Sequence, residues 1–222
     1  LEATMTTGPS KNANVEEKKT STTTDSTISP TTSSMYLCAI VVAVIAFGKQ
    51  NIDIPSLTGP PATSKPHNTF SEFYTFYSSE HQNPTCRLLH VIGTGVITII
   101  LVNSQTVEPS LLPSLGITLM TGYIACKALI GVEHGFFEFG IALTSLLCVT
   151  KLFGGRISVA LLIPLIGYSF AWVGHFFFEK NTPATFIYPM YSLIGDYTMF
   201  ARILMGIEPL DPTADGVSSV MD

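Results

Sequence analysis

Charged residues are scarce in this chain. Lysine, arginine, aspartate and glutamate make up 12% of its 222 residues, about half of the share that soluble globular domains carry. The mean hydropathy is correspondingly high, at +0.40. A soluble domain is therefore not the expected class, and lipid is the expected solvent of the apolar part.

Basic clusters and paired cysteines are also missing. The formal net charge is −5, and because affinity for phosphate backbones comes mainly from lysine and arginine, nucleic acid is excluded as a partner. Cys38, Cys86, Cys126 and Cys148 show no C-x-x-C spacing, and three of them lie in or beside apolar runs. A free cysteine there behaves as a small buried hydrophobe, so no disulfide framework is expected.

Histidine is rare as well, with five residues in the whole chain. Membrane desaturases and hydroxylases with a di-iron centre share clustered histidine boxes. These boxes contain more histidines than this whole chain has. That class is excluded, whereas a site with a single metal is not.

The residues that are present divide into a polar leader and an apolar remainder. Residues 1–34 are rich in serine and threonine, and we expect disorder because they bury too little apolar surface to offset the entropy of ordering. Residues 35–48 are an apolar segment of signal or anchor type, with a short helix on the membrane surface as the alternative. Residues 49–66, with four prolines, predict a linker, and residues 209–222 predict a flexible tail.

Residues 67–208 are predicted to form an all-α, multi-pass membrane bundle. An amphipathic helix opens it, because apolar side chains recur at helical spacing, and Asn68 or Thr69 is its expected cap. That apolar face consists of Phe70, Phe73, Tyr74 and Tyr77. About four hydrophobic segments follow, at residues 88–102, 111–130, 135–149 and 157–178.

Two histidines lie on either side of an Asn83-Pro84 dipeptide. On one straight helix, the offset of nine positions from His81 to His90 would place them about half a turn apart around the axis. Asparagine as a cap, with proline at the first helical position, instead begins a second helix. We expect this break to turn both rings toward one metal.

Two histidine–glutamate pairs lie at the edges of the apolar segments, where ionisable groups are costly and usually paired. In a helix, His134 with Glu138 and His175 with Glu179 would share a face. Each pair could offer a metal two ligands, or one imidazole oriented by a carboxylate; the alternative is a hydrogen bond at the headgroup level. Such ligands suit a non-haem Fe(II) centre that binds O2, while zinc and manganese stay open.

Two motifs resemble the Mpo-type 2-hydroxy fatty acid dioxygenase family. They are FxEFYxFYxSEHxNPxxRLLHxxG, at residues 70–93, and GYSFAWVGHFFFEKNTPATFIYPMYSLIGDYTMF, at residues 167–200. The resemblance implies an endoplasmic-reticulum membrane protein that uses Fe(II) and O2 to shorten a 2-hydroxy fatty acid by one carbon. This is fatty acid alpha-oxidation, which in the characterised branch serves the breakdown of phytosphingosine.

The resemblance also implies the site. His81, His90 and His175 carry over as metal ligands, with Glu179 beside the last as a ligand or an orienting carboxylate, whereas His134 has no support from the family motifs. Glu80 stands where some relatives have another histidine. If the three histidines bind one metal, they must lie within about 5 Å of one another.

The substrate is expected to come sideways from the lipid membrane, with its fatty-acyl chain between the helices that carry Phe176 to Phe178. Arg87, Lys180 and Asn181 are the expected contacts of its polar end, and Asp196 lies near the same place. Two alternatives stay open: a non-catalytic lipid-binding or scaffold protein, and, with less support, a small-solute transporter. Membrane orientation is not predicted, because lysine and arginine are too sparse for the positive-inside rule, and oligomeric state is not predicted either.

Overall fold

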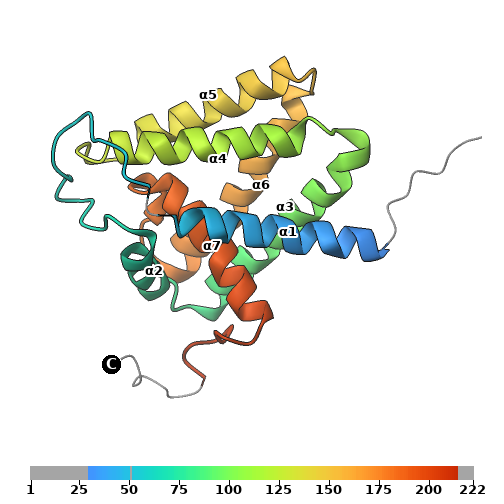
Figure 1. The fold of residues 1–222 in the computed structure, drawn as a ribbon. Coiled ribbons are helices and arrows are strands. Elements are labelled where there is room, and N and C mark those ends of the chain that lie inside the picture. The colour runs from blue at the N-terminus through green and yellow to red at the C-terminus, as the bar shows by residue number, and fades with distance from the viewer. Residues whose placement is uncertain (1–29, 51, 215–222) are drawn as a thin grey trace, which may run out of the picture.

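The computed structural model describes residues 30–50 and 52–214. Within these residues the chain forms seven α-helices and two short helical turns, with no strand, so the predicted all-α class is confirmed (Figure 1). The elements are α1 (Pro30–Gly48), α2 (Phe70–Ser79), α3 (Pro84–Val107), α4 (Leu111–Ala128), α5 (Phe136–Leu152), α6 (Ile157–Val173), η1 (Gly174–Glu179), η2 (Ala184–Phe186) and α7 (Pro189–Leu204).

The N-terminus of α2 is held by a capping box. Thr69 Oγ1 accepts the backbone N–H of Glu72 at 3.2 Å, and Glu72 Oε2 accepts the backbone N–H of Thr69 at 3.2 Å. These bonds satisfy N–H groups that have no partner within the helix. Of the two predicted caps, Thr69 is therefore the one used, and the apolar face of α2 is buried through Phe70, Phe73 and Tyr77.

The predicted break between α2 and α3 is confirmed. Asn83 Oδ1 accepts the backbone N–H groups of Thr85 and Cys86 at 2.9 and 3.4 Å, and Pro84 is the first residue of α3. The fixed φ of proline suits this position, where its missing N–H costs nothing. The chain thus changes direction between His81 and His90.

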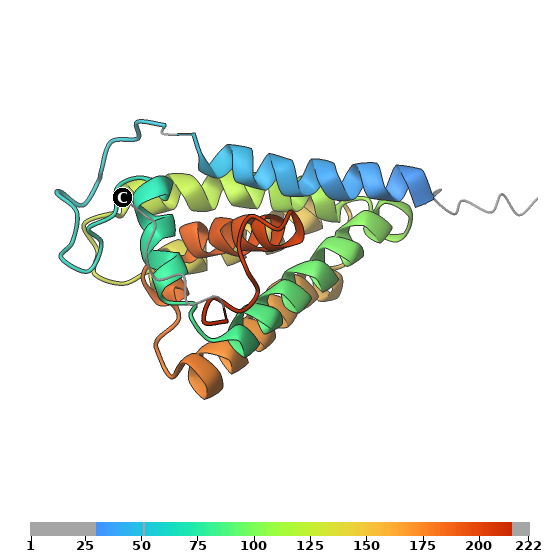
Figure 2. The same ribbon diagram turned by 90° about the horizontal axis from the view of Figure 1, so that it is seen from below.

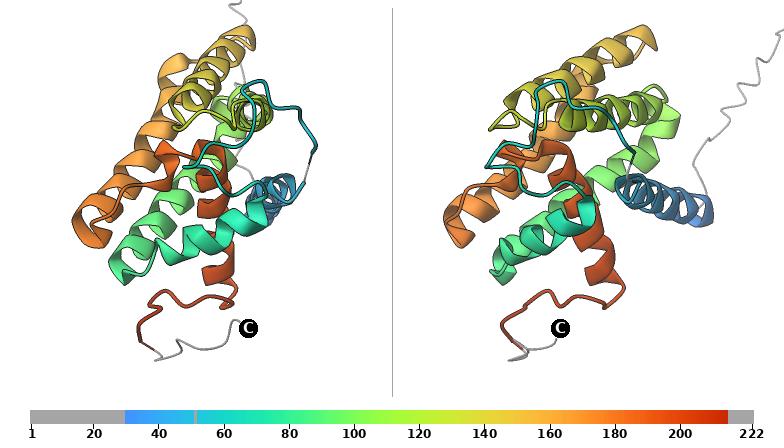
Figure 3. Two further views of the ribbon diagram at one scale, coloured as in Figure 1. Left: turned by 90° about the vertical axis from the view of Figure 1, so that its left-hand side faces the viewer. Right: turned by 60° about the vertical axis from the view of Figure 1, so that its left-hand side comes forward.

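Helix α7 lies in the middle of the molecule. Figure 2 shows it between α1 on one side and α3 with α6 on the other. Helices α4 and α5 form an antiparallel pair, and α3 packs along α6. Helix α2 lies against α7 near the start of α3 (Figure 3), so residues from both ends of the folded region meet there.

Three of the described helices are long and apolar enough to cross a membrane, at Pro84–Val107, Leu111–Ala128 and Ile157–Glu179. The remaining predicted segment forms α5, which has 17 residues and is not among them, so the count of four is not confirmed. Large apolar side chains on the three helices are exposed, for example Ile99 and Leu165 at 57% and 63%. Such surfaces fit contact with lipid.

Two predicted segments lie mostly outside the described residues. They are the leader predicted at residues 1–34 and the tail predicted at residues 209–222, which the structure describes only to residue 214. The apolar segment predicted at residues 35–48 lies within α1, which packs against α7 and α3. The linker after it contributes Lys65, whose ammonium pairs with Glu138 of α5 in the interior.

Candidate metal centre

His81 lies in the turn between α2 and α3 and is fully buried. Its Nδ1 is 2.6 Å from the carbonyl oxygen of Tyr77, and its ring stacks on the Tyr77 ring with centroids 4.1 Å apart. Because a carbonyl oxygen only accepts, Nδ1 carries the proton and donates. Nε2 of His81 is left with its lone pair.

His90 lies two turns into α3. Its Nδ1 donates to Asp196 Oδ1 of α7 at 2.9 Å, and the same oxygen accepts the hydroxyl of Tyr77. A carboxylate on the far ring nitrogen of a histidine is the arrangement that orients metal-binding imidazoles and raises their basicity. Asp196 thus links α2, α3 and α7 around the His90 ring.

His175 comes from the other end of the apolar region, in the π-helical turn η1. Its Nδ1 is 2.7 Å from Asn181 Oδ1, and Nδ2 of Asn181 donates to the backbone oxygen and the carboxylate of Glu80 at 3.0 and 2.9 Å. Gly174 allows this turn to approach α3, because a Cβ atom there would lie 2.8 Å from Cys86 Sγ. π-Helical turns of this kind occur often at functional sites.

The three histidines converge, as the sequence predicts. Nε2 of His81 lies 3.3 Å from Nε2 of His90, and the ring of His175 is centred 4.7 and 5.2 Å from the other two. One ligand atom from each lies within 4.8 Å of the others, in a group that also contains Cys86. All four residues are buried.

The residues of this group fit a metal ion. With both Nδ1 atoms protonated and both rings neutral, the facing Nε2 atoms of His81 and His90 bring two lone pairs together, an arrangement that a metal cation between them would stabilise. Metal–nitrogen bonds of about 2.1 Å at angles between a right and a tetrahedral angle place two nitrogens roughly 3.0 to 3.4 Å apart. The observed 3.3 Å lies in that range.

The protonation state of His81 agrees with this role. Burial, followed by the neighbouring His90 and His175 rings, lowers the pKa of His81 well below its usual value. The ring is therefore neutral at pH 7, which is the form that binds metals.

Cys86 and Tyr77 belong to the site but are not among the predicted site residues. Cys86 is one helical turn before His90 on α3, a spacing of four that could have drawn attention to it. Its burial agrees with the interpretation as a small hydrophobe. Tyr77 reaches the site through Asp196, 119 residues away in sequence, and no local signal points to that contact.

Glu179 lies beside the site, but it does not bond to His175. Its Oε1 accepts the backbone N–H of Asn83 at 2.5 Å, so it holds the turn before α3 in place. Asn181, rather than Glu179, orients the His175 ring. Glu179 is not part of the group of converging ligand atoms, and its role as a metal ligand stays a prediction.

His134 lies away from this group. The expected helical pairing of His134 with Glu138 is wrong, because α5 begins only at Phe136 and His134 precedes it. The His134 side chain is exposed and packs on Phe136, with ring centroids 4.9 Å apart. Glu138 is instead buried and paired with Lys65.

The predicted substrate contacts fall in different environments. Arg87 is buried; its Nη2 donates to Glu208 at 2.7 Å and its Nη1 donates to the backbone oxygen of His81 at 3.4 Å. Lys180 is exposed, and its backbone is left-handed, with φ of 59°. Asn181 contacts His175 as described. Their contacts with a substrate stay predictions.

An apolar cavity of about 570 Å³ begins at the histidine group. His90 and Asp196 lie in its wall, and from there it follows one face of α3 through Gly93, Ile97 and Leu101. Pockets that bind small molecules typically measure about 300 to 1,000 Å³ and combine apolar walls with a few polar groups. The cavity fits a long apolar ligand with a polar end at His90.

Substitution of Asp196 tests the orientation of His90. The Asp196→Ala variant is expected to bind metal about 10 to 100-fold more weakly, because the His90 ring loses its partner. Asp196→Asn keeps an acceptor oxygen and should lose less. Titration of the metal-free protein with Fe(II) or Co(II) measures both, and unchanged affinity in Asp196→Ala would show that His90 needs no such partner.

Comparison with known proteins gives one match. The family model described as 2-hydroxy-palmitic acid dioxygenase Mpo1-like matches residues 67–207, which include every residue of the histidine group. No curated protein and no solved structure matches the chain.

Proposed function

This chain belongs to the Mpo1-like family of 2-hydroxy-palmitic acid dioxygenases, and we propose that it oxidises a 2-hydroxy fatty acid with O2 at a metal held by His81, His90 and His175. The metal is Fe(II), and the substrate loses one carbon, as in alpha-oxidation of acids from sphingoid-base breakdown. The enzyme works in the endoplasmic-reticulum membrane.

The observation that carries the proposal is the convergence of three buried imidazoles, one of which, His90, lies in the wall of an apolar cavity. Each ring has its Nδ1 engaged by an oxygen atom, from Tyr77, Asp196 and Asn181 respectively. The ring orientations are therefore set before a metal arrives, which lowers the cost of binding one. The cavity supplies the room for an acyl chain.

If bound, Fe(II) would be held by the three histidines and would supply the redox chemistry that activates O2 toward the substrate. The residues of the chain do the rest. Asp196 and Asn181 hold two of the rings, and the apolar wall keeps water from the acyl chain. Lys180 is the proposed contact for the carboxylate, since it is the predicted cation with an exposed side chain.

The overall reaction balances without a further reductant. A 2-hydroxy acid and one O2 give the acid shorter by one carbon, CO2 and water. The substrate itself supplies all four electrons that O2 accepts. No binding site for an organic redox cofactor is required by this stoichiometry.

The test uses the full-length chain purified in detergent and loaded with Fe(II). We expect O2 uptake that depends on 2-hydroxypalmitic acid and formation of pentadecanoic acid, which mass spectrometry detects. Palmitic acid, which lacks the hydroxyl group, should give neither, and removal of the metal with a chelator should stop both. Tight binding of 2-hydroxypalmitic acid without any O2 uptake would instead favour the lipid-binding alternative.

A further inference from the structure

Helix α1 lies outside the residues that the family model matches, yet it forms part of the cavity wall. The match covers residues 67–207, whereas α1 ends at Gly48. The residues of α1 that line the cavity are Tyr36, Ala39, Ile40, Ala43, Val44 and Phe47. One side of the cavity is thus formed by a segment that lies outside the matched region.

The lining residues of α1 form one helical face. Their spacing of three and four residues places them along a single stripe about three turns long. Ile40 and Val44 are buried in the contact with the rest of the molecule. Ala39 and Ala43 are exposed within this stripe, whereas Val42, which is 64% exposed, and Ala46, which is also exposed, lie at its edge and do not line the cavity.

The position of α1 is set at its C-terminal end. A Cβ atom at Gly48 would lie 2.3 Å from Cγ2 of Ile194, so the backbone of α1 touches α7 directly. The Phe47 ring packs edge-on against Tyr123 at 5.2 Å, and the Tyr123 hydroxyl donates to the backbone oxygen of Gln50 at 2.6 Å. These contacts fix which face of α1 is turned toward the cavity.

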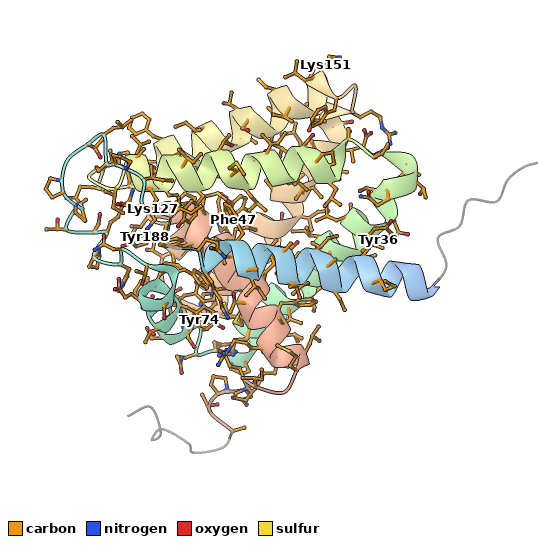
Figure 4. All side chains as sticks on the ribbon, in the orientation of Figure 1. Tyr36, Phe47, Tyr74, Lys127, Lys151 and Tyr188 are labelled. Atoms are coloured by element: carbon orange, nitrogen blue, oxygen red, sulfur yellow. The ribbon has the colours of Figure 1, made fainter. Side chains whose placement is uncertain are left out.

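Both α1 and the helix that carries His90 line the cavity, together with residues of α4, α5, α6 and α7. Along α3 its lining extends from His90 to Leu101, eleven residues or about 16 Å of helix. Tyr36 and Phe47 are eleven residues apart on α1 (Figure 4), so α1 lines the cavity over a similar length. The small side chains of Ala39 and Ala43 leave space that larger ones would fill.

We propose that α1 determines which acyl chains this protein accepts, with Ala39 and Ala43 as the specificity-determining positions. The inference rests on the proposed function for the identity of the ligand. It assigns α1 to the substrate site rather than to a separate anchor. A bulky side chain at either alanine shortens the space available to the acyl chain without touching the histidine group.

The test compares Ala43→Phe with Ala46→Phe, which adds the same side chain at an exposed position of α1 that does not line the cavity. In Ala43→Phe, turnover of 2-hydroxypalmitic acid relative to 2-hydroxyoctanoic acid should fall about 10-fold or more, as expected for steric exclusion from an apolar pocket. Ala46→Phe should keep the ratio of the unchanged protein. Ala39→Leu, a smaller change, provides a second variant if Ala43→Phe does not fold.

Two readouts separate this inference from the proposed function. Displacement of a fluorescent long-chain fatty acid measures the cavity without any reaction, and metal content reports on the histidine group. Weaker fatty-acid binding in Ala43→Phe but not in Ala46→Phe, with no turnover in any protein, would support the role of α1 and overturn the proposed function. Turnover with the same chain-length ratio in all three proteins would overturn the role of α1 alone.

Discussion

Replacement of His81, His90 or His175 by alanine is expected to abolish both metal binding and turnover of 2-hydroxypalmitic acid. Loss of an orienting partner already weakens metal sites about 10 to 100-fold, so loss of a ligand should cost at least about 100-fold in affinity. Each ring has its Nδ1 engaged by an oxygen atom, so each variant removes a ligand whose orientation is already set. Metal analysis of the purified variants measures the loss directly.

His134→Ala is the matched control for these variants. His134 is exposed and packs on Phe136, and it is not part of the buried group. This variant should keep its metal and its activity. Retained turnover in any two of the three buried-histidine variants would contradict the proposed site, and loss of metal in His134→Ala would restore that residue as a ligand.

Replacement of Lys65 by methionine should cause the largest loss of stability. Lys65 and Glu138 form an ion pair with side chains 2% and 1% exposed. Methionine fills the space of the lysine stem but leaves the carboxylate of Glu138 buried without a partner. Breaking a buried pair in this way costs about 3 to 5 kcal/mol, to be measured as the free energy of unfolding in detergent micelles.

The control is the double variant Lys65→Met/Glu138→Leu. It removes both charges, and replacing a buried pair by apolar residues is often neutral or stabilising. We therefore expect the double variant to recover most of the stability lost in the single one. If Lys65→Met is as stable as the unchanged protein, then Lys65 and Glu138 are not buried together, and the linker does not pack against α5 as described.

Local features of the chain were predictable because their hydrogen bonds join close neighbours in sequence. Thr69 caps α2 through Glu72, and Asn83 caps α3 through Thr85. Such bonds form wherever the local sequence allows them, whatever the rest of the chain does. The same local reasoning predicted the helix break between His81 and His90 and the proximity of their rings. In the structure their Nε2 atoms lie 3.3 Å apart.

Features that depend on distant segments were missed or misjudged. The spacing of His134 and Glu138 predicts a shared helical face, but α5 starts too late for His134, and Glu138 finds its partner 73 residues away in Lys65. Glu179 follows the same spacing from His175, yet the turn between them is π-helical and its carboxylate binds the backbone of Asn83. Periodicity cannot anticipate either outcome, since both depend on what the folded chain brings alongside.

The sequence by itself determined the all-α class, the apolar character of the chain and the caps of α2 and α3. It also identified three histidines as candidate metal ligands. These follow from composition and from spacings of a few residues, which act within one helix or turn. Only the tertiary structure decided which side chains orient the histidines, that Cys86 joins their group, and that α1 lines the cavity. Those contacts join residues far apart in the chain, and their formation depends on the packing of whole helices against one another.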